Sequence, residues 1–111
     1  MARGREGGEF RLRVSDVVEV PLRGTILRLK VLDGQPAIGD VKPGRRLRLS
    51  GPSGEARTIR IEDHAVIGGR QTQDRLDRLR EVDVIVSFDD AQGEGAPVRE
   101  GWTAAGPVTD G

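Results

Sequence analysis

Apolar and polar residues alternate along most of the chain, in the period-two pattern of half-buried β-strands. The first such segment covers residues 10–20, and its expected inward residues are Leu12, Val14, Val18 and Val20. Ser15 and Asp16 interrupt the alternation, which predicts a bulge or bend between two halves of one strand. Pro21 should end the strand, because proline cannot donate a ladder hydrogen bond.

Three further segments alternate aliphatic residues with cations. They cover residues 25–31, 45–50 and 55–61, and the last two read as a hairpin around a Gly-Pro-Ser-Gly turn. Their expected inward residues are Leu27, Leu29, Val31, Leu47, Leu49, Ile59 and Ile61. Because outward positions of a half-buried strand face water, the intervening cations need no ligand to explain them.

The segments between these strands carry turn signals. Residues 32–44 contain three glycines and two prolines, which predicts a surface loop. Residues 64–69 are expected to form a short strand or a turn that enters a loop.

One helix is predicted over residues 72–82. Leu76, Leu79 and Val82 recur at a spacing of three, and Thr72 can cap the start. The run "VDVIVSF" at residues 82–88 is the most strand-like of the chain and suits burial on both sides. A last short strand is expected within residues 101–106.

About six short strands and one minor helix predict an all-β fold, a small closed antiparallel six-stranded β-barrel. We expect this barrel to occupy residues 9–107, between flexible Gly-rich tails at residues 1–8 and 108–111.

Composition agrees with one modest domain. The chain has 111 residues, of which 35% are hydrophobic and only 3% aromatic, so its core must consist of Val, Ile and Leu. There is no cysteine, no apolar run long enough to span a membrane and no secretion signal at the start. We therefore expect a cytoplasmic domain that binds no metal or cofactor and has no membrane partner.

Charge is unevenly distributed although the net charge is zero. Residues 22–60 hold nine Lys or Arg and three acids, whereas residues 61–111 hold five arginines and eleven acids. This asymmetry indicates either a basic binding face with an acidic counterpart or two halves that neutralise each other within one barrel.

The basic segment supplies the candidate site. If residues 25–31, 46–50 and 55–61 are neighbouring strands, their outward cations can share one surface and hold several phosphates. With Arg23 of an Arg-Gly-Thr turn, the candidate nucleic-acid-binding residues are Arg23, Arg28, Lys30, Arg46, Arg48, Arg57 and Arg60. The alternative is a solvated face with no ligand. With so few aromatics to stack bases, RNA would be contacted mostly through its backbone.

Other chemistry is weakly indicated. His64, the single histidine, lies beside Glu62 and Asp63, but one histidine without cysteine favours a strand-end residue over a metal site or base. Asp89-Asp90 reads as a solvated loop, and no Ser-His-Asp arrangement can be assembled. Trp102 can either stack on a base or pack across a barrel end.

The order of three motifs resembles the second, β-barrel domain of the translational GTPases, such as elongation factor Tu. These are "FRLRVSDVVEVPLRGTI", "KPGRRLRLSG" and "VREGWTAAGP", and the resemblance covers residues 9–107. The matching residues are Asp16, Val17, Arg23, Gly24, Thr25, Gly44, Leu47, Leu49, Gly51, Val98 and Gly101. Ser15 and Val18 stand where that family usually has an acidic residue and an aromatic of its aminoacyl pocket, so the resemblance does not extend to that pocket.

The resemblance implies a barrel of the elongation-factor type that contacts tRNA or ribosomal RNA. The chain lacks the phosphate-binding loop and guanine-reading motif of a GTPase, so it binds no nucleotide alone and either stands by itself or works with a separate GTPase chain. We therefore expect a non-catalytic module that binds RNA phosphates or a ribosome-associated partner. The alternative is a protein–protein interaction adaptor that has lost the RNA role, as the altered Ser15 and Val18 positions and the acidic segment 87–100 suggest.

Overall fold

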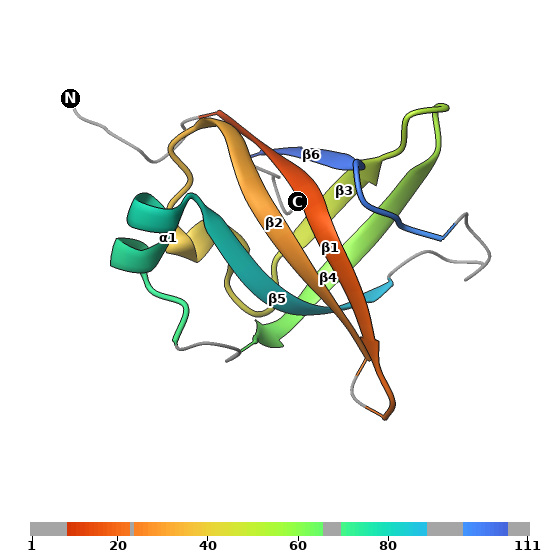
Figure 1. The fold of residues 1–111 in the computed structure, drawn as a ribbon, viewed down its shortest axis with the longest axis horizontal. Coiled ribbons are helices and arrows are strands. Elements are labelled where there is room, and N and C mark those ends of the chain that lie inside the picture. Colours follow the sequence, from red (N-terminus) through yellow and green to blue (C-terminus); the bar gives the residue numbers. More distant parts are fainter. Residues whose placement is uncertain (1–8, 23, 66–69, 89–96, 107–111) are drawn as a thin grey trace.

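A computed structural model describes residues 9–22, 24–65, 70–88 and 97–106. Six strands form a closed antiparallel barrel in the order β1-β2-β5-β4-β3-β6 (Figure 1). The strands are β1 (Phe10–Val20), β2 (Gly24–Gly34), β3 (Arg46–Ser50), β4 (Ala56–His64), β5 (Glu81–Phe88) and β6 (Thr103–Gly106). The predicted fold class, an all-β six-stranded barrel with one short helix, is confirmed.

The interior is filled by aliphatic side chains from alternate positions of every strand. All seven inward residues expected in β2, β3 and β4 are buried, and Val82, Val84 and Val86 join them from β5. Phe10 and Trp102 add two aromatic rings to this core. The period-two pattern therefore predicted the core of these strands correctly.

The long first hairpin extends beyond this core (Figure 1). The register of β1 on β2 shifts between Val14 and Asp16, which confirms the predicted bulge at Ser15 and Asp16. Beyond the bulge β1 pairs only with β2, and Val18 is 42% exposed while Val20 is only partly buried. The expectation that Val18 and Val20 point into the core was therefore wrong, because the extra residue of the bulge reverses the alternation. Val17, opposite the buried Leu27, packs against the core, and Val18 faces outward.

The predicted loop at residues 32–44 contains more regular structure than expected. Its first residues extend β2 to Gly34, and a single 3-10 turn, η1 (Ile38–Val41), follows. The backbone N–H of Ala37 donates to the Asp40 carboxylate at 2.9 Å, which fixes the start of this turn.

The helix α1 (Gln73–Leu79) is shorter than predicted and packs on β5 (Figure 1). Thr72 is the N-cap, as expected, and its hydroxyl accepts from the backbone N–H of Arg75 at 3.1 Å. Leu76 is buried, but Leu79 is 40% exposed, because the chain turns at Arg80 in a left-handed conformation and enters β5. No helix of the described segments is long and apolar enough to cross a membrane.

Two glycines with similar backbone angles test how tightly β1 and β2 are packed. Gly34 has a φ of 84° and Gly44 a φ of 96°, so both favour glycine. A Cβ at Gly34 would meet the backbone of Glu9 and Phe10, whereas a Cβ at Gly44 would have nothing within 4 Å. We expect Gly34→Ala to lower the free energy of unfolding by about 3 kcal/mol and Gly44→Ala by about 1 kcal/mol.

Urea denaturation followed by circular dichroism measures both changes. Equal effects of the two substitutions would contradict the close approach of β2 to β1, because the left-handed conformation alone would then account for the loss.

Candidate nucleic-acid interface

The strand order divides the predicted basic surface in two. β3 and β4 are neighbours, as expected, but β2 pairs with β1 and β5 and with neither β3 nor β4. Arg28 and Lys30 therefore face a different side of the barrel from Arg46, Arg48 and Arg60. The expectation that all these cations share one surface was wrong, because β5 inserts between β2 and β4. Arg23 lies outside the described residues.

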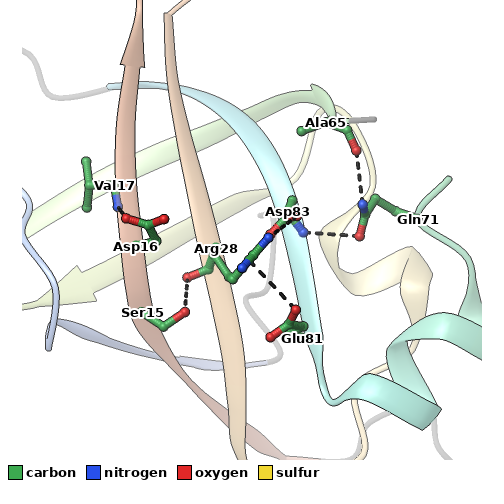
Figure 2. Close-up of polar contacts among 8 residues, drawn as sticks. All are labelled: Ser15, Asp16, Val17, Arg28, Ala65, Gln71, Glu81 and Asp83. Atoms are coloured by element: carbon green, nitrogen blue, oxygen red, sulfur yellow. Dashed lines mark hydrogen bonds and ion pairs between the residues drawn. The ribbon is translucent and has the colours of Figure 1, made fainter. Parts of the chain in front are cut away.

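Arg28 forms an ion pair on its own side of the barrel (Figure 2). Its Nε and Nη2 donate to the two carboxylate oxygens of Asp83 at 2.8 and 3.2 Å, and Glu81 lies 3.8 Å from Nε. The hydrogen bonds and charge of Asp83 raise the pKa of Arg28 further above its usual value. Because Nε and Nη2 already donate to Asp83, this guanidinium has few N–H groups left to bind a phosphate.

Asp83 is buried although it points outward from β5. Its exposed fraction is 2%, since Arg28 covers it from β2 and Gln71 from the segment before α1. The Gln71 amide accepts from the backbone N–H of Asp83 at 3.1 Å and donates to the carbonyl of Ala65 at 3.0 Å (Figure 2). The network therefore links Ala65, which follows β4, and Gln71, which precedes α1, to β5.

Arg57 points into the barrel and not out of it. It is 7% exposed and its guanidinium carbon lies 4.4 Å from the centre of the Phe88 ring, a cation–π contact. Its assignment to the outer surface was wrong. The period-two rule contained the signal, because residue 57 has the same parity as the inward Ile59 and Ile61.

Three of the predicted cations remain together and exposed, on β3 and β4. Arg46 lies directly opposite Arg60, and Arg48 lies opposite Thr58. Arg60 is 4.0 Å from Glu62, which offsets part of its charge. Lys30 is also exposed, but it lies opposite Glu81 on the other side of the barrel.

The structure adds two arginines that the sequence interpretation missed. β6 pairs with β3 on one edge and β1 on the other, so the exposed Arg11 and Arg13 of β1 lie one strand away from Arg48. We call the outward arginines of β1 and β3 the arginine face: Arg11, Arg13, Arg46 and Arg48. The alternation in "FRLRV" resembles that in "RRLRLS" and was the available signal, but which strand closes the barrel beside β3 was not predicted.

The strand segments that carry the arginine face contain no acidic residue. Residues 10–14, 46–50 and 103–106 contain four arginines and no Asp or Glu. Carboxylates border this face, where Asp33 is opposite Arg11 on β2 and Glu9 precedes β1. Like charges held this close produce a local positive potential that attracts an anion.

The other candidates do not form a second site among the described residues. His64 ends β4, as expected, and its Nε2 lies 3.0 Å from the carbonyl oxygen of Val41. In the described ranges no three His, Cys, Asp or Glu side chains gather as metal ligands. Trp102 is 3% exposed within the core, so it packs and does not offer a face to a base. Asp89 and Asp90 lie outside the described residues.

The chain was compared with protein-family models, with curated proteins and with solved structures, and none of the three comparisons gives a match.

The contact between Arg28 and Asp83 predicts opposite roles for two outward cations of β2. Arg28→Ala leaves a buried carboxylate without its partner, so we expect the free energy of unfolding to fall by about 1–3 kcal/mol. Lys30→Ala, two residues along the same strand, should change it by less than about 0.5 kcal/mol. Chemical denaturation of both variants makes the comparison.

A double-mutant cycle with Asp83→Ala separates the pair from other effects. The double variant should lose less stability than the sum of the two single variants. Additive losses would show that the two side chains do not stabilise each other.

Proposed function

We propose that this barrel is a non-catalytic module that binds RNA through its phosphates, and that the arginine face is the contact surface. The observation that carries the proposal is the closure of the barrel by β6, which places the arginines of β1 and β3 on one surface whose own strand segments contain no Asp or Glu. Arginine suits this role because its guanidinium binds phosphate oxygens in pairs and stays charged.

The size of the face limits the strength of binding. Four guanidinium groups can neutralise about four phosphates, so the logarithm of the binding constant should fall with the logarithm of salt concentration with a slope of about −3 to −4. Affinity should then decrease by about 100-fold between 50 and 200 mM salt. Arg60 contributes less than Arg48, because Glu62 lies beside it.

The resemblance of the motifs to the barrel of translational GTPases supports tRNA or ribosomal RNA as the partner class. Those motifs include Leu47 and Leu49, which point inward between the arginines of β3 and set their outward direction. The same resemblance favours a role beside a separate GTPase chain, since this chain carries no phosphate-binding loop.

Substitution of the β3 arginines tests the proposal. We expect Arg46→Ala/Arg48→Ala to weaken binding to tRNA and ribosomal RNA fragments at least tenfold at about 50 mM salt and to reduce the salt slope by about two. Fluorescence anisotropy with labelled RNA at several salt concentrations measures both quantities.

The matched control removes two exposed arginines elsewhere, by Arg70→Ala/Arg78→Ala. Arg78 lies on α1, which packs on β5, and β5 is opposite β6 in the ring of strands. This control should bind within about twofold of the unchanged protein. No binding of any RNA at 50 mM salt would overturn the proposal, and protein partners retained from lysate after nuclease treatment would then favour the adaptor function.

A further inference from the structure

We propose that the β6 side of the barrel selects double-helical RNA, with phosphates held by the arginine face and ribose 2′-hydroxyls contacted by Ser50 and Thr103. This inference rests on the proposed function and adds to it the form of nucleic acid and the two residues that distinguish RNA from DNA.

Two rows of outward residues cross the three strands. Ser50 lies opposite Thr103, and Thr103 lies opposite Arg13, so two hydroxyls and one guanidinium form the first row. Ala105 lies opposite Arg11, and continuing the register of Leu49 with Ala104 places Arg48 on the other side of Ala105. The second row is therefore an alanine between two arginines.

The second row is hollowed at its middle, because Ala105 has a short side chain. Ala105 is exposed, and an open pocket of about 450 Å³ is lined by Ala105 and Arg11. Glu9, which precedes β1, and Asp33 of β2 line the same pocket, and their carboxylates repel phosphate from that side of it. The path for a phosphate backbone is thus confined to the width of β3, β6 and β1.

The hydroxyls of Ser50 and Thr103 are available for a ligand. Neither one hydrogen-bonds to another residue in the part of the chain that is described, and Ser50 is exposed while Thr103 is half-buried. A hydroxyl both donates and accepts, which matches the ribose 2′-hydroxyl.

The aromatic residues argue against a single-stranded ligand. Proteins that bind single strands stack bases on exposed aromatic rings. Phe10 and Trp102 are buried in the core, and the Phe88 ring is on β5, opposite β6, and lies under Arg57. No ring of this chain can therefore stack a base at the arginine face.

The shape of the surface fits a duplex. Neighbouring strands lie about 4.8 Å apart and alternate residues about 6.7 Å apart, and the four arginines span three rows, so they start from an area of about 10 by 13 Å on a convex wall. The minor groove of A-form RNA is wide and shallow, and it presents 2′-hydroxyls between two phosphate backbones. A convex wall with hydroxyls flanked by arginines complements that arrangement.

A single substitution at Ala105 tests the location. Ala105→Glu places a carboxylate between Arg48 and Arg11, and we expect it to weaken binding of a 20-base-pair RNA duplex about tenfold at 50 mM salt. Ala105→Gln has the same size without the charge and should bind within about threefold of the unchanged protein. Circular dichroism and thermal unfolding verify that both variants fold.

The second arm tests the form of nucleic acid. The RNA duplex should bind at least fivefold more tightly than the DNA duplex of the same sequence and than single-stranded oligouridine of the same length. Ser50→Ala/Thr103→Val should remove the preference over DNA and leave the salt slope unchanged, because no cation is lost.

The outcomes separate this inference from the proposed function. If RNA binds but Ala105→Glu has no effect, or if DNA and single strands bind equally well, the duplex site at β6 is wrong and RNA binding by the barrel still stands. If no RNA binds, both proposals fail together.

Discussion

The closed barrel and its arginine face depend on the pairing of one four-residue strand, β6, with two others. β6 hydrogen-bonds to β1 and β3 and so closes the cylinder. Without it the edges of β1 and β3 would expose unpaired backbone groups, and the core would open to water. Closure also brings together arginines that are more than thirty residues apart in the sequence. The same backbone contacts thus complete the core and create the arginine face.

The partner strand decides what an outward arginine does. Arg28 and Arg48 occupy equivalent positions in similar sequence, each between two buried leucines. Arg28 faces Asp83 on β5 and becomes part of a structural network, whereas Arg48 lies next to β6, whose outward residues are small and neutral. Whether an outward arginine forms an ion pair within the barrel therefore follows from the neighbour across the sheet and not from the local pattern.

The sequence predicted local features well and spatial relations poorly. The strands, the bulge at Ser15 and Asp16 and the Thr72 cap follow from period, turn residues and hydrogen-bonding chemistry within a few positions. The strand order does not, because β2 and β5 are joined by contacts between residues over fifty positions apart, which no local pattern encodes. Arg57 is a different case, because it lies two residues before the inward Ile59. The period-two rule by itself therefore predicts that Arg57 points inward. Val18 is a further case, because the bulge reverses the alternation and turns Val18 outward, and the expected inward residues did not take that reversal into account.

A face of four arginines also constrains how such a protein can work. Binding that depends on about four phosphates is weak at physiological salt, because most of its free energy comes from released counterions. A second contact to the same assembly would raise the effective concentration of the RNA and compensate for this weakness without any new arginine. The hairpin of β1 and β2 extends away from the barrel, and its tip carries Leu22, which is fully exposed at a φ of 68°. An apolar residue held there in a left-handed conformation gains nothing from burial, so the tip of the hairpin is a place where a second contact of this kind would bury apolar surface.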